Sequence, residues 1–268
     1  MAYHQGEIEV QSRAGVREQA ARMGAALQPR IPDRARAFLS DQRFVVLSTI
    51  DLQGNVWASL RSGEPGFLQT PDDRTLLIHT ANTEHLRENP AIGVLAIEFE
   101  TRRRMRLNGT AEILGSGQGI RINTQQVYAN CPKYIHPHEV ILRDELDKAK
   151  GLRTAELSAE QQAWIEKADT FFIATYHPSA GADASHRGGP AGFVKAPDSQ
   201  HLVFPDFPGN NMFNTLGNLS VYSSAGLLFV EFNTGATLQI TGEAIVRWGE
   251  VRNVIVTIKE VVETRYAD

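Results

Sequence analysis

"TFFIATYHPSAGADASHRGGPAGFV", residues 170–194, carries the strongest structural signal in this sequence. An apolar run with β-branched and aromatic residues is followed by Pro, Gly and Asp and then by a second run, a pattern typical of a β-hairpin. The second run ends in Ser185, His186, Arg187 and two glycines. A guanidinium can hold a phosphate with two parallel hydrogen bonds, and glycine lets backbone N–H groups approach closely. We therefore expect an anion site at the end of this hairpin.

The end of this hairpin has a counterpart earlier in the chain. "ASLRSG", residues 58–63, aligns with "ASHRGG", residues 184–189, when the sequence is shifted by 126 positions. The same shift aligns Thr49 with Thr175, Arg61 with Arg187, and Leu76 with Leu202 without a gap. Farther along, a shift of 133 aligns Gly93 with Gly226, Phe99 with Phe232, and Gly109 with Gly242. Two copies of this period indicate duplicated modules, because a solenoid needs three repeats or more.

Each copy is predicted to consist mostly of β-strands. The apolar runs include "RFVVLSTI" at 43–50, "AIGVLAIEFE" at 91–100, "GLLFVEF" at 226–232 and "VRNVIVTIKEVVE" at 251–263. One short helix interrupts each copy, at 83–90 in the first and at 211–219 in the second. About six strands with one helix predict a small closed barrel, which leaves no strand edge exposed.

The flanking segments are predicted to be helical. "GVREQAARMGAAL", residues 15–27, has apolar residues at helical spacing. Ser158, followed three residues later by Gln161, forms a capping-box pattern at the start of a second helix. The chain is therefore divided into an N-terminal helical segment (1–40), a first module (41–115), a helical linker with the "NCPKY" loop (116–168) and a second module (169–268).

Composition limits the classes of function. The 268 residues are 42% hydrophobic and 22% charged, with a net charge of −4 and a pI of about 6.1. A general nucleic-acid binder needs a basic excess that this chain lacks. Apolar runs such as 227–230 are far too short for a membrane span. No secretory signal is visible, and the single Cys131 excludes an internal disulfide. We expect a soluble cytoplasmic protein with no nucleic-acid or membrane partner.

The chain resembles the pyridoxamine 5′-phosphate oxidase-like, FMN-binding split-barrel superfamily. The landmarks are "WASLRSGEPGFL" (57–68), "TRRRMRLNG" (101–109), "NCPKYI" (130–135) and "PDFPGNNMFNTLGN" (205–218). The resemblance is closest to tandem members, and it implies a mainly β fold of two split-barrel modules with peripheral helices. It also implies a flavin in a cleft between barrels, its phosphate held by an Arg or Lys of the second strand and by the following helix start. Where many members have Ser-x-Lys at that helix start, this chain has Gly-Asn-Asn at 209–211.

The resemblance and the residues together predict a cofactor site. Its members are Trp57, Arg61, Arg104, Lys133, Tyr134, Ser185, His186, Arg187, Gly188, Pro205, Asp206, Asn210, Asn211 and Asn214. Helix N–H groups near the asparagines can bind an anion, and strand alternation places Arg102, Arg104 and Arg106 on one side. Tyr134 or Trp57 can pack on a flat ring. Each feature also has a structural interpretation: a solvated arginine, a local helix cap, a solvated hairpin or a loop that covers a cleft.

The implied function is that of an FMN-dependent oxidoreductase acting on a small-molecule substrate or electron donor. FAD, a deazaflavin or haem are alternative cofactors, and a flavin carrier or a haem-binding protein is the alternative function. His177, His186 or His201 could then be the axial ligand. No catalytic residue is assigned, and no metal site is expected, since Cys131 with the His-x-His at 136–138 is a weak zinc pattern. We expect Arg187 to anchor the phosphate, Arg61 to be structural or to contact the distal part of the ligand, and the protein to be a homodimer.

Overall fold

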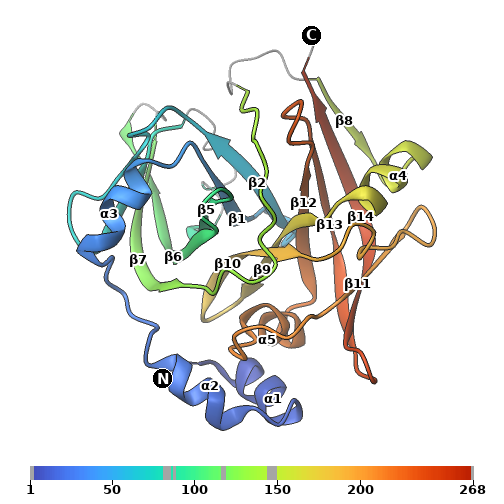
Figure 1. Ribbon diagram of the computed structural model, residues 1–268, viewed down its shortest axis with the longest axis horizontal. Helices are drawn as coiled ribbons and strands as arrows, with labels where there is room; N and C mark the ends of the chain where they lie inside the picture. The colour runs from blue at the N-terminus through green and yellow to red at the C-terminus, as the bar shows by residue number, and fades with distance from the viewer. Residues whose placement is uncertain (1–2, 81–85, 87–88, 116–118, 144–149, 267–268) are drawn as a thin grey trace.

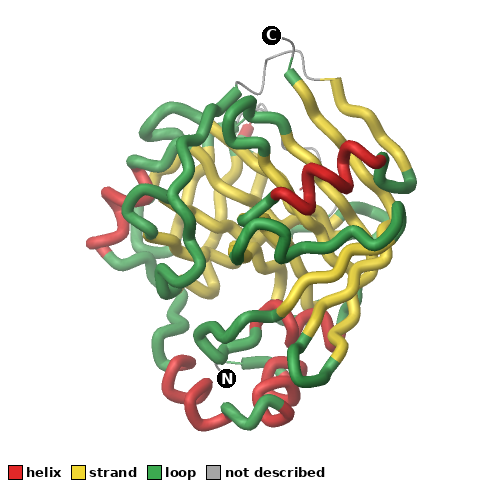
Figure 2. Tube along the Cα trace, turned by 45° about the vertical axis from the view of Figure 1, so that its right-hand side comes forward, coloured by secondary structure: helices red, strands yellow, loops and turns green. Residues whose placement is uncertain are grey.

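Strands dominate the computed structural model, which describes residues 3–80, 86, 89–115, 119–143 and 150–266. They form two antiparallel sheets of seven strands each, one for each copy of the repeat. In Figure 1 the first sheet lies on the left and the second on the right, and Figure 2 shows the helices at the periphery of the strands. The predicted mainly β architecture of two tandem split-barrel modules is confirmed.

The two sheets share one topology. The first has the order β2-β1-β5-β6-β7-β4-β3. Its strands are β1 (Phe44–Ile50), β2 (Val56–Ser62), β3 (Leu68–Gln69), β4 (Thr75–Ile78), β5 (Ala91–Glu98), β6 (Arg103–Ile113) and β7 (Ile120–Ala129). The second has the order β10-β9-β12-β13-β14-β11, with β8 also paired to β14. Its strands are β8 (Lys150–Thr154), β9 (Thr170–His177), β10 (Gly181–Gly188), β11 (His201–Pro205), β12 (Ser224–Val230), β13 (Thr237–Arg247) and β14 (Asn253–Arg265).

Repeat-equivalent strands occupy equivalent places, so the duplication of the sequence is a duplication of the fold. Even a local irregularity is duplicated: the β6–β7 ladder shifts register beside Gly109, and the β13–β14 ladder shifts beside Gly242. A Cβ atom at Gly109 would lie 2.1 Å from the Asn123 carbonyl oxygen, and one at Gly242 would lie 2.2 Å from that of Thr257. The bulge therefore requires glycine in both copies. Among the described residues no pairing joins the ends of either sheet, so the barrels are split rather than closed.

The segment 116–168 differs from the helical linker that the sequence predicts. It contains β7, which pairs with both β6 and β4, and β8, which pairs with β14. In β7, buried and exposed positions alternate along "IRINTQQVYA", as expected for a strand with one face on the core. Its many polar residues conceal this alternation in the sequence. The first sheet therefore extends to Ala129, and helix begins only after Ser158.

The helices predicted at 15–27, after Ser158 and at 211–219 are found, and two more lie in the N-terminal segment 1–40; the described helices are five in number. They are α1 (Gln5–Arg13), α2 (Arg17–Gly24), α3 (Asp33–Ser40), α4 (Ala159–Lys167) and α5 (Asn214–Val221). Ser158 and Gln161 form the expected capping box of α4. The helix predicted at 83–90 lies largely outside the described residues. Within the described chain, none of the helices has the length and apolarity that crossing a bilayer requires.

The two modules pack through equivalent strands. β5 lies against β10, and β12 lies against β2. A Cβ atom at Gly93 would lie 2.7 Å from the Cα of Asp183, and one at Gly226 would lie 2.7 Å from the Cα of Trp57. Because Gly93 corresponds to Gly226, and Trp57 to Asp183, each contact is the counterpart of the other, as in an isologous dimer interface. The arrangement creates two equivalent clefts between the modules.

An apolar core fills the space between the sheets. It draws on both modules and includes Phe44, Val46, Leu95, Phe172, Ala184 and Leu228. Two further clusters fill the interiors of the first and the second barrel. Apolar interfaces of this kind are typical of permanent association, so the clefts between the modules have rigid walls.

The close approach of the sheets predicts how these glycines respond to substitution. Gly93→Ala and Gly226→Ala should each lower the free energy of unfolding by about 1–3 kcal/mol, because the new methyl group meets backbone atoms that cannot turn away. The control is Gly151→Ala, whose added Cβ meets only the Val262 side chain at 3.9 Å. Urea denaturation measures all three variants. Equal midpoints for the three would contradict the close packing of the sheets.

Candidate functional site

One of the two clefts between the modules is strongly basic. Its main cavity has a volume of about 160 Å³ and is lined by Arg104, Arg106, Asn130, Cys131, Lys133, Tyr134, Ser185, His186, Arg187, Gly188, Phe193, Pro205, Phe207, Gly209 and Asn210. A neighbouring cavity of about 60 Å³ shares Arg106, Arg187, Phe207, Gly209 and Asn210 with it and extends to the first turn of α5. We call the two cavities together the basic cleft.

A buried ion pair between the modules forms the floor of the basic cleft. Arg106 of β6 donates from Nη1 to Asp183 Oδ2 of β10 at 2.8 Å and from Nη2 to Ser185 Oγ at 2.5 Å. The other carboxylate oxygen of Asp183 accepts from Asn108 Nδ2 at 3.0 Å and from Tyr128 Oη at 3.1 Å. Burial raises the pKa of Tyr128, so its hydroxyl stays protonated as a donor. The network fixes β6 against β10.

Strand alternation explains which arginines reach the cleft. Arg104 and Arg106 share one face of β6, whereas Arg103 pairs with Glu98 on the exposed side. Arg102 was expected on the cleft side but lies in the preceding turn with φ 54°, because the strand begins only at Arg103. Alternation therefore holds from the strand onward and fails in the turn.

Arg187 and Arg104 are held differently. Arg187 Nη1 lies 3.2 Å from Asp206 Oδ1, and Arg252 binds the other oxygen of that carboxylate at 3.0 Å. Arg104 donates to His186 Nδ1 at 2.7 Å and to the Cys131 carbonyl at 2.8 Å. Within the described chain, Arg104 has no carboxylate at ion-pair distance. Burial, and then the charges of Arg106 and Arg187, lower the pKa of Arg104 to about 9.

His186 is a neutral donor. Arginine only donates hydrogen bonds, so His186 Nδ1 accepts from Arg104 and the ring proton is on Nε2. Burial, and then the neighbouring arginines, place the pKa of His186 well below its usual value. His186 Nε2 and the Nε atoms of Arg104, Arg106 and Arg187 are all buried without a hydrogen-bond partner. Buried donors are almost always paired in folded proteins, so these four N–H groups indicate a missing acceptor.

The N-terminus of α5 faces the same cleft. Its first turn, Asn214 to Leu216, lines the smaller cavity. The N-cap residue, Phe213, has a left-handed backbone (φ 59°) and no side chain caps the helix. The first backbone N–H groups of a helix lack intrahelical partners and carry a partial positive charge. Together with Arg106 and Arg187 they make an anion-binding corner.

A loop of the linker closes the cleft. Lys133 Nζ and Tyr134 Oη both donate to the Pro208 carbonyl, at 3.2 and 3.3 Å. The ring of Tyr134 stacks on that of Phe207, with centroids 5.4 Å apart. A Cβ atom at Gly188 would lie 2.0 Å from the Tyr134 carbonyl oxygen. Glycine at position 188 therefore allows this loop to pack closely against the end of β10.

The structure brings most of the predicted site residues together. Arg104, Lys133, Tyr134, Ser185, His186, Arg187, Gly188, Pro205, Asp206, Asn210, Asn211 and Asn214 line the basic cleft. Trp57 and Arg61 do not, and line a separate cavity between β2 and the β13–β14 ladder. The prediction left out Arg106 and Phe207, which line both cavities of the basic cleft. Alternation had already placed Arg106 on the same side of the strand as Arg104, although Arg106 was not included among the predicted site residues, whereas nothing chemical in the sequence distinguished Phe207.

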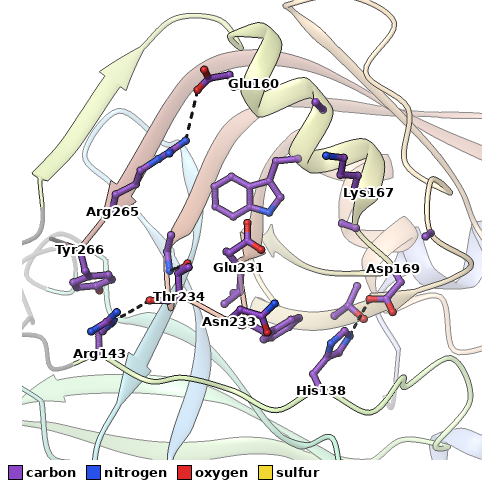
Figure 3. Close-up of a pocket in the computed structure, with 18 residues that line it drawn as sticks. His138, Arg143, Glu160, Lys167, Asp169, Glu231, Asn233, Thr234, Arg265 and Tyr266 are labelled. Carbon is purple, nitrogen blue, oxygen red and sulfur yellow. Dashed lines mark hydrogen bonds and ion pairs between the residues drawn. The ribbon is translucent and has the colours of Figure 1, made fainter. Parts of the chain in front are cut away.

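A larger cavity elsewhere has a different character. It measures about 910 Å³ and lies between α4, the segment 138–143 and the turn after β12 (Figure 3). His138 points to Asp169 at 2.9 Å, and Arg143 donates to the Thr234 carbonyl at 2.9 Å. Its three basic side chains, Arg143, Lys167 and Arg265, are balanced by three carboxylates, Glu160, Asp169 and Glu231. Such a lining does not favour an anion. No group of described His, Cys, Asp and Glu residues could hold a metal ion.

Comparison with known proteins shows which family the sequence matches. The sequence matches the family described as "Pyridoxamine 5′-phosphate oxidase" over residues 31–145 and 157–254. No curated protein matches it. Three similar solved structures each correspond to less than half of this chain. A candidate pyridoxamine 5′-phosphate oxidase from Lactobacillus delbrueckii is 18% identical, with 42% of this chain and 98% of that chain covered and a TM-score of 0.35.

Two other similar structures have different described ligands. An FAD-binding protein from Mesorhizobium loti is 9% identical, with 44% of this chain and 100% of that chain covered and a TM-score of 0.31. A haem storage protein from Vibrio cholerae is 17% identical, with 36% of this chain and 90% of that chain covered and a TM-score of 0.25. Each of these proteins is about as long as one module of this chain.

Glu7 of α1 connects the N-terminal segment to the cleft. It lies against Gly217 of α5, where an added Cβ would be 2.5 Å from the Glu7 side chain. Its Oε1 accepts from Asn214 Nδ2 at 2.5 Å, and its Oε2 accepts from the His4 backbone at 2.8 Å. Burial raises the pKa of Glu7 from 4.5 to about 7. The Glu7 carboxyl therefore stays protonated in the folded protein at pH values at which it is ionised in the unfolded chain.

This raised pKa predicts a pH-dependent stability. The contribution of protonated Glu7 to the free energy of unfolding is fully present below about pH 4.5 and is lost as the pH rises through about 7. Between pH 5 and pH 8, wild type should lose about 2–3 kcal/mol relative to Glu7→Gln, which has no such proton to lose. Urea denaturation of both proteins at the two pH values measures this difference, and the comparison cancels the histidines they share. A difference that stays constant with pH would contradict the protonated state of Glu7.

Proposed function

This chain belongs to the pyridoxamine 5′-phosphate oxidase family, and from that premise we propose that the basic cleft binds the phosphate of a flavin, FMN before the alternatives. The observation that supports this most is the set of unsatisfied buried donors on Arg104, Arg106, Arg187 and His186. They line a cleft that also presents the start of α5. Among the described residues, four cations and no carboxylate line its main cavity. This donor set fits a phosphate group.

The charge of the cleft favours FMN over FAD. A phosphate monoester concentrates about −1.5 to −2 charges on one group at neutral pH, whereas the diphosphate of FAD spreads a similar total charge over two groups. Arg187 and the N–H groups of α5 would hold the phosphate, with Arg106 beneath it. Arg104 would supply a further cation, and His186 Nε2 a neutral donor. The cavity of about 160 Å³ is smaller than usual for a whole small molecule, so we assign it the phosphate end only.

The proposed activity is that of a flavin-dependent oxidoreductase with a small-molecule substrate. A bound flavin supplies the redox chemistry, and the protein supplies binding, orientation and electrostatics. Within the part of the chain that the structure describes, no carboxylate that could act as a general base lines the main cavity. The residues of this chain are therefore proposed to bind and orient the cofactor. Since both modules of one chain build the cleft, the proposal needs no second chain.

A haem-binding function is the second candidate, because His186 is buried, neutral and unpartnered at Nε2. Its tautomer counts against this candidate. A histidine that ligates iron through Nε2 usually donates its Nδ1–H to an acceptor, but here Nδ1 faces a donor, Arg104. The absorbance spectrum of the purified protein separates the two, since flavins absorb near ~450 nm and haem near ~400 nm.

Removing Arg187 should weaken FMN binding more than removing Arg61. A hydrogen bond to a charged group contributes about 1.5–3 kcal/mol, which corresponds to about 10–150-fold in affinity. Arg187→Ala should therefore raise the Kd for FMN at least ~10-fold, and Arg61→Ala clearly less. Fluorescence titration of FMN into the apoproteins measures both. Equal losses would show that both clefts bind FMN or that they share one site, and a loss only in Arg61→Ala would show that the basic cleft is not the phosphate site.

Riboflavin, which lacks the phosphate, gives a sharper test of the same assignment. Wild type should bind FMN at least ~10-fold more tightly than riboflavin. In Arg187→Ala this preference should fall toward one, because only the contact to the phosphate is lost, and the affinity for riboflavin should hardly change. The matched control is Arg30→Ala, an exposed arginine paired with Asp73 outside the cleft. An unchanged preference in Arg187→Ala would place the phosphate elsewhere.

A further inference from the structure

The second cleft between the modules is the counterpart of the basic cleft. It lies where β2 faces the β13–β14 ladder, and its cavity measures about 450 Å³. Trp57, Ser59 and Arg61 line it from one face of β2, as Ser185 and Arg187 line the basic cleft from β10. Gln239 of β13 crosses the cleft and donates to the Ala58 carbonyl at 2.8 Å. The backbone frame is therefore duplicated.

The side chains on this frame have diverged. Trp57 occupies the position of Asp183, and Gln239 that of Arg106. Arg106 pairs with Tyr128 across the β6–β7 ladder, and Gln239 pairs with Val262 across the β13–β14 ladder. The charged network of Arg106, Asp183 and Tyr128 is therefore replaced by an indole, an amide and an aliphatic side chain. The resulting cavity is nearly three times as large, about 450 Å³ against 160 Å³.

The described residues that line the second cleft have a net charge of about +1. Arg61, Arg153 and Lys259 line it together with two carboxylates, Asp51 and Glu260. Arg153 forms an ion pair with Glu260 at the exposed edge. Asp51 accepts hydrogen bonds from the Trp57 indole N–H at 2.8 Å and from the loop around it. The described residues that line the cleft therefore carry a positive balance of one charge.

A buried hydroxyl and an aromatic face complete the lining. Ser59 is 7% exposed, and its Oγ is buried without a hydrogen-bond partner. Trp57 is also 7% exposed, and its indole N–H is held by Asp51, so the ring has a fixed orientation. The Arg61 guanidinium lines the same cavity, and Lys259 reaches Asn55 Oδ1 at 2.6 Å. An unpartnered buried hydroxyl beside a fixed ring and a guanidinium is a lining for a flat ligand with one acidic group.

We propose that the second cleft is a separate binding site for a small aromatic carboxylate. The carboxylate would pair with Arg61 and accept from Ser59, and the ring would pack on Trp57. A positive balance of one charge suits a monoanion, whereas the four cations of the basic cleft suit a phosphate. The site goes beyond the proposed flavin site and does not depend on it. One duplicated frame would thus bind two anions of different charge and shape.

Benzoate is the probe for this site, and Trp57 is the reporter. Trp164→Phe and Trp248→Phe leave Trp57 as the only tryptophan. In that protein, benzoate at constant ionic strength should change the fluorescence saturably, with a Kd of about 1 mM or below, in the range open to a ligand of this size. Cyclohexanecarboxylate, which has the same charge but no flat ring, should bind more weakly. Fluorescence that does not saturate with benzoate would overturn the proposal.

Variants separate this site from the basic cleft. Arg61→Ala should weaken benzoate binding at least ~10-fold, and Ser59→Ala should weaken it less. Arg187→Ala, at the equivalent position of the other cleft, should leave it unchanged. Arg61→Lys, which keeps the charge and loses the planar fork, replaces Arg61→Ala if the latter does not fold, and should also bind more weakly.

FMN titrated into the same proteins tests the flavin proposal separately. FMN binding without benzoate binding would refute this inference alone, and the reverse would refute the flavin proposal alone. Equal weakening of benzoate binding by Arg61→Ala and Arg187→Ala would show that the two clefts do not act as separate sites.

Discussion

The ion pair between Arg106 and Asp183 is the contact on which the basic cleft depends. It joins β6 of the first module to β10 of the second at 2.8 Å, with both side chains less than 10% exposed. Burying two charges costs nearly as much as their attraction returns, so such a pair adds little net stability. Its effect is on geometry. Asp183 also accepts from Asn108 and Tyr128, so one carboxylate fixes the register of three side chains of the first module beneath the cleft.

The same contact explains why duplication did not produce two identical sites. The frame comes from backbone features that both copies share, namely the glycines at 93 and 226 and the bulges beside Gly109 and Gly242. Those features fix how closely the sheets approach, and they leave the lining side chains free to differ. With Trp57 at the position of Asp183, β2 has no carboxylate at this position to hold a cation on β13, and Gln239 stands opposite. A change at one position of the pair therefore goes with a change at the other.

The sequence predicted what depends on local patterns. The repeat, the hairpins, the capping box at Ser158 and the helix after residue 210 all follow from periodicity and turn residues within a few positions. It failed where the outcome depends on packing at long range. Trp57 was assigned to the same site as Arg187 because its ring can pack on a flat ring, and Arg61 because it is the repeat counterpart of Arg187. The structure places both in a different cleft from that of Arg187, because β2 of the first module faces the second module and β10 of the second module faces the first. β7 was missed because its polar residues hide the alternation.

The composition also conceals the charge of the cleft. The whole chain has a net charge of −4. Yet four cations line one cavity in which no carboxylate takes part, because Asp183 lies beneath it and Asp206 borders only the smaller cavity. Burying Arg104 beside other cations is unfavourable, because burial first and the charges of Arg106 and Arg187 second lower its pKa to about 9. Groups held in such an environment are characteristic of functional sites. A bound anion would offset that repulsion, which is why the cleft is better explained as a binding site than as a structural junction.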